Sequence, residues 1–324
     1  MAMFIARRVG QGVLLLFVMS FLVFVAVYAL GDPVTTLINP ASPPAVIEQA
    51  VRNLGLDQPL HVQYLRFLEN ALRGELGNSY TSSQPALRLI VQRFPATLEL
   101  TTAAMVIAAV VGIPLGLVAG YCPDSPLGRL VGGVSIVGIS LPTFWIGLML
   151  IIVFAIQLGL LPTGGRGPTV TILGIETSLL SWEGLRHIAL PALNLSLFPM
   201  AMMVRLTRAG VQENLRTNFV RFARAKGLFA RRILLVYVLR SVLIPIVTIM
   251  GMVFGELLAF GVVTETVFAW PGIGKLIIEA IRTSDRPVIV AYLLFTVVIF
   301  SGINLAADIV CAMIDPRLSL SEAK

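Results

Sequence analysis

The chain has few charged residues and few of the side chains that build metal or redox sites. Only 13% of its 324 residues are charged, and it contains two cysteines and two histidines. A soluble globular protein has about 25% charged residues, so the composition indicates a chain whose main solvent is the lipid bilayer. His61 and His187 are too few for a zinc site within one chain and are interpreted as polar surface. Cys122 and Cys311 lack a CxxC spacing and are expected to be free thiols.

A nucleotide-binding P-loop is also missing, because no GxxxxGK[ST] pattern occurs. Gly274 and Lys275 resemble the end of such a motif, but Ala269 stands where the first glycine is required, and Leu276 where Ser or Thr is required. The chain is therefore not expected to bind ATP, and neither a cofactor nor a metal ion is expected in it. If the function of this chain depends on ATP hydrolysis, the ATPase must be a separate chain.

Long apolar runs dominate the sequence. Hydrophobic residues make up 57% of the chain, and the mean hydropathy is +0.90. A membrane-spanning helix needs about 20 apolar residues, and continuous runs favour helices over the alternating strands of a barrel. The sequence predicts an all-α polytopic membrane protein with six transmembrane helices. They cover about residues 9–30, 97–120, 134–158, 189–212, 240–263 and 288–313.

The distribution of charge predicts the orientation in the membrane. With the N-terminus in the cytoplasm, the outer segments are 31–96, 159–188 and 264–287. They hold ten basic and ten acidic residues, whereas nine of the 14 other Lys and Arg residues lie between Arg205 and Arg240. This excess fits the positive-inside rule. Membrane orientation therefore explains the basic character of the chain, no nucleic-acid partner is needed, and both termini are expected in the cytoplasm.

The first outer segment, 31–96, is too long for a simple connection. Helical spacing is present over Val46–Leu54 and Leu60–Leu72, and Leu76–Tyr80 is typical of a turn. We interpret the segment as a small extracytoplasmic helical cap. The predicted organisation is a cytoplasmic N-terminus with the first helix (1–30), the cap (31–96), a five-helix permeation core (97–313) with a cytoplasmic loop at about 213–239, and a cytoplasmic tail (314–324).

Two further outer connections are rich in glycine and proline. The run Pro162–Pro168 predicts a flexible connection, and Trp270 followed by Pro271 and Gly272 predicts an interfacial anchor and a tight turn. Within the spans, Pro142 is expected to bend its helix.

The loop between the fourth and fifth spans predicts an amphipathic helix. Phe219, Phe222, Ala223 and Lys226 follow the i, i+3, i+4, i+7 spacing of one helix face. Such a helix either rests on anionic lipid or fits a groove on a soluble partner, and the spacing leaves both uses open.

The residues around this predicted helix favour a partner. Arg221 and Arg224 are displaced from the apolar face, and Gly227 permits a backbone turn before a second basic helix that begins at about Phe229. The small side chain of Ala225, like that of Ala223, permits close approach of another backbone.

Polar side chains within the apolar runs are candidates for a solute pathway, because a charge at the bilayer centre costs roughly 2.5–3.5 kcal/mol. Glu256 is the deepest, and it either faces the amine of a peptide or another cationic solute, or is a buried acid paired with a neighbouring helix. Glu99 and Asp308 lie near span ends, where hydration or an arginine partner suffices. Asn194 and Asn304 could line the pathway, but interhelical hydrogen bonding is favoured.

Several short motifs follow one another along the chain and make it resemble a known family. They are Leu54–Leu60 with Gln63-Tyr64, Pro95–Leu100, Ser140–Phe144, Ala223–Gly227 and Phe268–Gly274, between Phe4–Arg8 near the start and Ile314–Arg317 near the end. The chain resembles the ABC importer permeases of the dipeptide/oligopeptide/nickel branch, specifically the first, or B-type, of their two permease subunits.

This resemblance implies the ABC type I importer permease fold and a pore-forming role in the bacterial inner membrane. It implies a second permease subunit, two ATPase subunits that bind ATP and Mg²⁺, and an extracytoplasmic substrate-binding protein as partners. It also identifies the loop after the fourth span as the coupling loop that docks on the ATPase. The residues implied in that contact are Phe219, Arg221, Phe222, Ala223, Arg224, Ala225, Lys226 and Gly227.

The match to the family's coupling motif, which begins Glu-Ala-Ala, is partial. Ala223 and Gly227 agree with it, but Arg221 stands at the position of the glutamate, so contacts made by that acidic side chain are absent here. A motif proline that normally follows the glycine is replaced by Arg240, and Pro245 is the nearest proline.

Two other classes of membrane protein are alternatives to a permease. A membrane-embedded hydrolase would need an HExxH motif, or a serine and a histidine, within the spans, and both histidines are predicted to lie outside them. A secondary transporter would need no ATPase and often contains inverted repeats, which the sequence does not display. Short peptides are the expected solutes by resemblance, with glutathione-like thiols and nickel chelates as alternatives.

Overall fold

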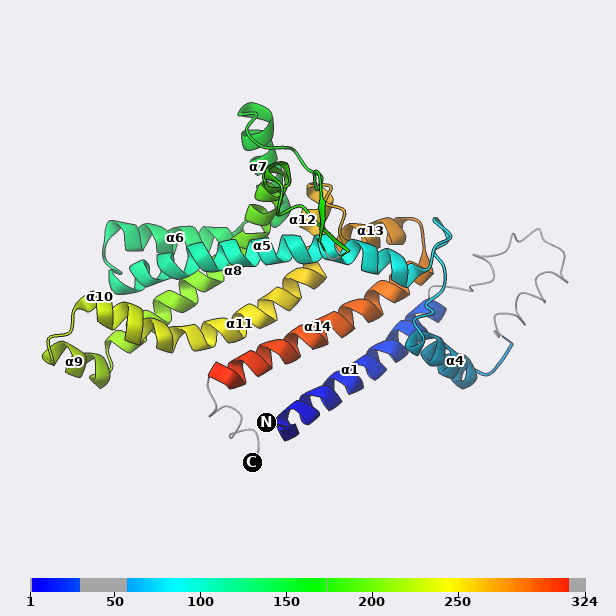
Figure 1. Ribbon diagram of the computed structural model, residues 1–324, viewed down its shortest axis with the longest axis horizontal. Helices are drawn as coiled ribbons and strands as arrows, with labels where there is room; N and C mark the ends of the chain where they lie inside the picture. Colours follow the sequence, from blue (N-terminus) through cyan, green and yellow to red (C-terminus); the bar gives the residue numbers. More distant parts are fainter. Residues whose placement is uncertain (1, 30–56, 173, 315–324) are drawn as a thin grey trace. The chain divides into compact units, whose positions relative to one another are not determined.

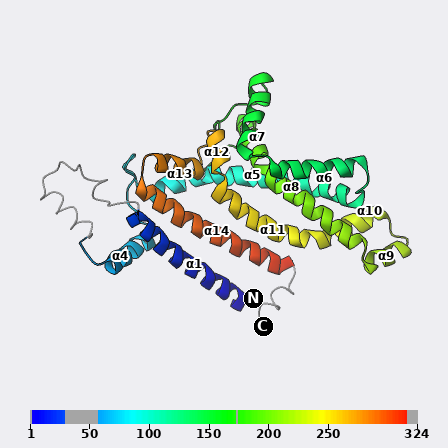
Figure 2. The ribbon, with the colours of Figure 1, turned by 180° about the vertical axis from the view of Figure 1, so that it is seen from behind.

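The computed structural model describes residues 2–29, 57–172 and 174–314, and helices make up most of them (Figures 1 and 2). The predicted helix at Val46–Leu54 and the tail beyond Ile314 lie outside the described residues. The predicted helix at Leu60–Leu72 is confirmed with the same bounds.

Long helices alternate with short helical segments. The long helices are α1 (Ala2–Ala29), α5 (Ala86–Tyr121), α8 (Trp182–Leu215), α11 (Leu239–Phe260) and α14 (Arg286–Ile314). The shorter α-helices are α4 (Leu60–Leu72), α6 (Pro126–Ser140), α7 (Thr143–Leu150), α9 (Asn218–Ala225), α10 (Ala230–Arg232), α12 (Val262–Val267) and α13 (Ile273–Arg282). Two π-helices, η1 (Ile151–Gln157) and η2 (Ile233–Val238), and two strands, β1 (Val170–Ile172) and β2 (Ile175–Thr177), complete the described elements.

Most of the predicted spans correspond to helices that can cross a bilayer. Four described helices are long and apolar enough, at Ala6–Ala26, Ala86–Tyr121, Trp182–Leu215 and Arg286–Ile309. A fifth span is present if Ala230–Leu243 and Pro245–Ala259, which meet at an angle of 48°, form one bent helix.

The third predicted span, 134–158, is divided in the structure. Helix α6 ends at Ser140 and α7 begins at Thr143, with Pro142 between them. Proline has no N–H for the helical ladder and disfavours helical geometry at the residue before it, which explains the break. Helix α7 continues directly into the π-helix η1, so the apolar run is two helical pieces rather than one span.

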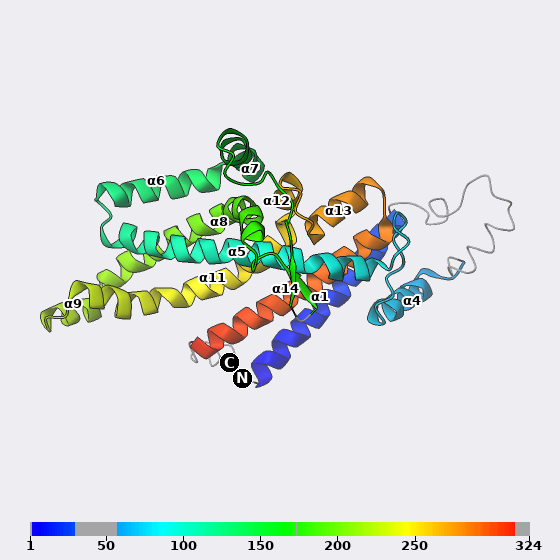
Figure 3. The ribbon, with the colours of Figure 1, turned by 45° about the horizontal axis from the view of Figure 1, so that its top comes forward.

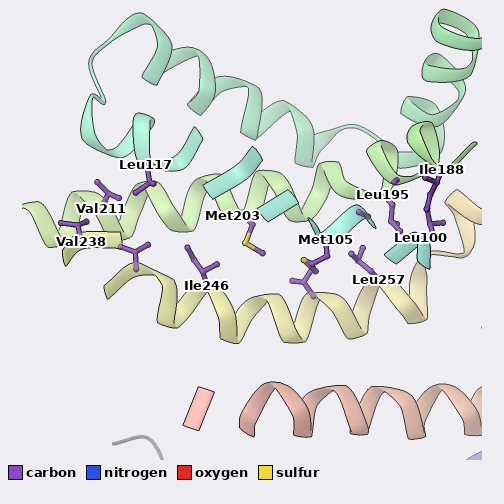
Figure 4. Packing of buried hydrophobic residues seen from close by; sticks show 14 of the residues in the cluster. Leu100, Met105, Leu117, Ile188, Leu195, Met203, Val211, Val238, Ile246 and Leu257 are labelled. Atoms are coloured by element: carbon purple, nitrogen blue, oxygen red, sulfur yellow. The ribbon is translucent and has the colours of Figure 1, made fainter. Parts of the chain in front are cut away.

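The chain forms two compact units. Unit 1 contains Met1–Ala6, Arg93–Lys275 and Phe300–Lys324, and unit 2 contains Arg7–Gln92 and Leu276–Ile299. In unit 1, the buried apolar core lies among α5, α8 and α11 (Figure 4).

Glycines in α5 allow this helix to lie close to α8. Gly112, Gly116 and Gly120 follow an i, i+4, i+8 spacing, and a Cβ on Gly112 would lie 2.9 Å from the Met200 carbonyl oxygen. A Cβ on Gly120 would likewise lie 2.7 Å from Cβ of Val211. Helices α5 and α8 therefore pack closely at positions that require residues without a side chain.

In unit 2, α4 lies beside α1 (Figure 3), and aromatic rings join the two helices. The Tyr64 ring makes edge contacts with Phe21 and Phe24 at centroid distances of 5.6 and 5.3 Å, and its hydroxyl lies 2.9 Å from Ser20 Oγ. The predicted cap helix therefore contacts the first span through its aromatic side chains, whereas Leu60, Leu65 and Leu72 on the same helix are 60–83% exposed.

The predicted flexible connection after η1 is instead tied to the rest of unit 1. Gly165 N donates a 2.8 Å hydrogen bond to the Phe268 carbonyl, and His187 Nδ1 lies 2.9 Å from the Gly164 carbonyl. The antiparallel β1–β2 hairpin follows, with Val170 opposite Thr177, and is a small addition to the predicted all-α fold. His187 thus has a structural contact and is not plain polar surface.

Candidate functional site

The first candidate is the short helix α9, which lies between α8 and α10 at the end of unit 1 away from α7 and α12 (Figures 1 and 3). It extends from Asn218 to Ala225, within the predicted cytoplasmic loop. Thr217 precedes it with extended backbone angles, which ends the continuous helical path of α8 and redirects the chain.

Helix α9 has one face toward its own chain and one face outward. Val220 and Ala223 are buried in the main core cluster, with exposed fractions of 1% and 3%. Phe219 and Phe222 are 54% and 60% exposed. Phenylalanine is normally buried, so a pair exposed on one short helix marks a surface that another molecule can cover.

The predicted apolar face of this helix is therefore only partly correct. Ala223 points into the core and lets α9 lie close to its own chain, so it does not provide close approach to a partner. Arg221, Arg224 and Ala225 are exposed as expected. Lys226 is also exposed, and its ammonium nitrogen lies 4.7 Å from the centroid of the Phe222 ring, a cation–π contact.

Gly227 ends α9 as predicted. Its φ of +76° is left-handed, and the amides of Gly227 and Leu228 donate to the carbonyls of Arg224 and Ala223 at 2.9 and 3.2 Å. These two bonds form a Schellman motif, in which the residue after the helix is favoured to be glycine. Because no atom lies within 4 Å of a Cβ added at Gly227, the backbone conformation and not crowding requires glycine there.

The predicted second basic helix is confirmed close to its expected start. Helix α10 covers Ala230–Arg232 and passes into the π-helix η2 before α11 begins. The Phe219 ring meets the Tyr237 ring edge-on at 5.4 Å, which ties α9 to η2. An open cavity of about 460 Å³ lies between these two elements.

The three predicted pathway residues have different environments. Glu256 is exposed on α11, and Asn304 is half-buried on α14. Asn194 is 1% exposed, and its Nδ2 donates a 3.0 Å hydrogen bond to Thr264 Oγ1. Its role within this chain is the interhelical hydrogen bond between α8 and α12.

A second polar cluster, which the sequence analysis missed, surrounds Glu265 in α12. This carboxyl group is 1% exposed and accepts hydrogen bonds from Thr97 Oγ1 at 2.6 Å and from the Lys275 amide at 2.9 Å. A Cβ on Gly272 would overlap the carboxylate, so the loop fits around it only because this residue is glycine. Burial raises the pKa of Glu265, while hydrogen bonds from Thr97 and the Lys275 and Gly274 amides oppose that rise.

Trp270 belongs to the same region and corrects a prediction. It is fully buried, and its indole Nε1 donates a 2.8 Å hydrogen bond to the Ala96 carbonyl. It is therefore not an interfacial anchor. The predicted tight turn is confirmed, because the Gly272 amide donates a 2.9 Å hydrogen bond to the Trp270 carbonyl.

Glu99 has the arginine partner that its position near a span end allowed. Arg166 Nη2 lies 2.7 Å from Glu99 Oε2, and both side chains are nearly buried. The other carboxylate oxygen accepts a 2.7 Å bond from the Ser178 amide. This ion pair joins α5 to the outer connection that contains the hairpin.

Family models match almost the whole chain. Residues 112–320 match the model described as binding-protein-dependent transport system inner membrane component. Residues 1–101 match the model for the N-terminal region of such membrane components. The chain belongs to this family of importer permeases.

Relatives of the permease are named as parts of peptide transport systems. It is 38% identical over 332 residues to the di/tripeptide transport system permease protein DppB of Pseudomonas aeruginosa, covering 98% of this chain and 99% of that protein. It is 35% identical over 335 residues to the dipeptide permease DppB of Escherichia coli K12, with the same coverage. A glutathione transport system permease, GsiC of Escherichia coli O6:H1, is 39% identical over 304 residues and 94% of each chain.

The fold of the permease is that of an ABC type I importer permease. A chain of the inward-facing MetNI methionine ABC transporter matches with a TM-score of 0.56 at 18% identity, covering 72% of this permease and 99% of that chain. The permease is accordingly a pore-forming, non-enzymatic transport subunit and a multi-pass inner-membrane protein.

The Glu99–Arg166 ion pair is expected to stabilise the permease, and this can be tested by mutation. Glu99→Ala or Arg166→Ala alone is expected to destabilise it by about 3–5 kcal/mol, because each removes the closest ion-pair partner of a nearly buried charge. The double variant is expected to lose less stability than the sum of the losses in the two single variants. A double-mutant cycle of apparent Tm in detergent measures this coupling, and additive losses would contradict a direct pair.

Proposed function

We propose that the permease forms the pore of an ATP-driven, binding-protein-dependent importer for di- and oligopeptides. It works with a second, homologous permease subunit, two ATPase subunits that hold ATP and Mg²⁺, and an extracytoplasmic binding protein. The names of the DppB relatives in Pseudomonas aeruginosa and Escherichia coli support peptides as the solute. The glutathione permease GsiC is itself 39% identical, so a glutathione-like solute is the second candidate.

The coupling role of α9 is supported by the exposed Phe219 and Phe222 side chains on a helix whose other face is fixed to the core. In this proposal, the aromatic pair docks on an ATPase subunit on the cytoplasmic side. Closure of the ATPases on ATP then moves α9 together with α8 and α11, because Val220 and Ala223 belong to the same buried cluster as these helices. Such coupling requires that the docked contact differ between two states of the membrane helices.

The transport proposal is tested with the complete importer in proteoliposomes. Uptake of a labelled dipeptide is expected to require the binding protein and internal ATP, and to be reduced more by unlabelled peptides than by glutathione. Stronger competition by glutathione would replace the peptide assignment with the second candidate. Uptake that continues when ATP hydrolysis is blocked would instead indicate a secondary transporter.

Glu256 is proposed to line the solute pathway, because an exposed carboxylate on a spanning helix is costly against lipid and is expected to face water or another subunit. Glu256→Gln is expected to reduce uptake of peptides with a free amino terminus about tenfold, the loss typical of one charge-assisted hydrogen bond. Uptake of N-acetylated peptides is expected to change little. A variant that assembles normally and transports both peptides like the wild type would exclude this role.

A further inference from the structure

The cavity between α9 and η2 is lined by polar side chains that have no part in the proposed coupling role. Phe219, Val236 and Tyr237 give it apolar walls, while Arg240 and Ser241 line it with polar groups. Both polar residues are exposed, and within the described parts of the chain neither Arg240 nor Ser241 has a side-chain hydrogen bond or ion pair. A guanidinium and a hydroxyl therefore remain available as donors beside an apolar surface.

The predicted spans place this cavity at the level of the lipid headgroups. Asn214 and Thr217 come just after the fourth predicted span, and Arg240 and Ser241 begin the fifth. A binding site at this level needs donors for a phosphate and an apolar wall for the upper acyl chain, which is the combination found here. One wall is the π-helix η2, and π-helical turns occur frequently at functional sites.

The charge around the cavity favours an anionic ligand. Nine Lys and Arg residues lie between Arg205 and Arg240, with Glu213 as the only acid in that stretch. Arginine binds phosphate oxygens through two parallel N–H groups, and basic pockets at the cytoplasmic side of membrane helices bind anionic lipid headgroups.

We propose that the α9–η2 cavity binds the headgroup of an anionic phospholipid. The Arg240 guanidinium and the Ser241 hydroxyl donate to its phosphate, and Val236 and Tyr237 contact the glycerol and upper acyl chain. Since Phe219 both lines the cavity and contacts Tyr237, the bound lipid fixes the angle of α9 and with it the position of Phe222. Anionic lipid is thereby a structural ligand of the coupling segment.

The test is native mass spectrometry of the full-length chain, with whatever partners co-purify, after reconstitution with equal amounts of phosphatidylglycerol and phosphatidylcholine. Retention of phosphatidylglycerol is expected to fall about fivefold in Arg240→Gln. The matched control is Arg231→Gln, which removes the same charge from an exposed arginine of α10 that does not line the cavity. It is expected to retain lipid like the wild type.

Two results would overturn the proposal. Equal losses in Arg240→Gln and Arg231→Gln would show attraction by overall charge without a site. If Arg240→Gln retained as much phosphatidylglycerol as the wild type, the lipid would not bind in this cavity. This conclusion would hold whether or not the ATPase subunits were lost, and another molecule or none would then fill the cavity. Arg240→Lys keeps the charge but not the paired donors, so it is expected to fold like the wild type and retain lipid at an intermediate level. The measurement needs neither peptide nor ATP, so its outcome is independent of the transport proposal.

Discussion

Replacing Phe219 and Phe222 together by alanine is expected to abolish ATP-driven uptake while leaving the permease folded. The two rings are more than half exposed and contribute little to the core, whereas Val220 and Ala223 hold the helix in place. Aromatic anchors at the centre of an interface contribute about 2 kcal/mol or more each, so affinity for the ATPase is expected to fall about 1,000-fold when both are removed. Co-purification of the ATPase subunits and uptake in proteoliposomes measure the loss.

The control for this variant is Trp182→Ala. Trp182 is 78% exposed at the other end of α8, so its truncation removes a comparable area of exposed aromatic surface far from α9 along the helix. It is expected to leave ATPase binding unchanged. If the Phe219/Phe222 variant kept wild-type uptake and ATPase binding, α9 would not be the coupling element.

Glu265→Ala is expected to destabilise the permease by about 2–6 kcal/mol, because each of the two buried donors left without an acceptor costs about 1–3 kcal/mol. Alanine leaves the Thr97 hydroxyl and the Lys275 amide without their acceptor and opens a void beneath the Gly272 loop. Glu265→Gln keeps the volume but presents an NH₂ group to one of these donors, so an intermediate loss is expected. Apparent Tm in detergent and the yield of monodisperse protein are the measurements.

Glu183→Ala provides the comparison for Glu265. Glu183 lies in the first turn of α8, is about half exposed and pairs with Arg186 three residues later, so its loss is expected to cost less than about 1 kcal/mol. Equal apparent Tm values for the Glu183 and Glu265 variants would contradict the cluster as a determinant of stability.

Periodicity and charge in the sequence were sufficient to predict the long helices and the turn at Gly227. They predicted α4 with its bounds and the left-handed glycine after α9, since both depend on local backbone preferences. The break at Pro142 was predicted as a bend but is a full interruption: α6 ends at Ser140 and α7 begins at Thr143, because proline has no N–H for the helical ladder and disfavours helical geometry at Leu141.

Side-chain environments set by distant contacts were not predictable in the same way. Trp270 looked like an interfacial anchor, yet it is buried in the main core cluster, and its indole donates a hydrogen bond to the Ala96 carbonyl. The buried site of Glu265 was not predicted, because the residues next to it in sequence do not indicate its hydrogen bond to Thr97, which is 168 residues away. The glycines of Gly272-Ile-Gly274 were the available signal, since two glycines so close together indicate that something must approach the backbone.

The face of α9 that packs on the core was also misjudged for a physical reason. Helical spacing places Phe219, Phe222 and Ala223 close together around the helix, but it does not specify which part of that arc the core covers. The core covers the part with small and β-branched residues, Val220 and Ala223, and leaves the two rings outside.

The central claim is that α9 is the element through which a separate ATPase drives the permease, and site-specific photocrosslinking tests it most directly. A benzoylphenylalanine in place of Phe222 is expected to crosslink to the ATPase subunit in the assembled importer, whereas the same probe in place of Trp182 is not. A probe at Phe222 that captures no ATPase, or that reacts with reagents confined to the outer side of the membrane, would contradict the account.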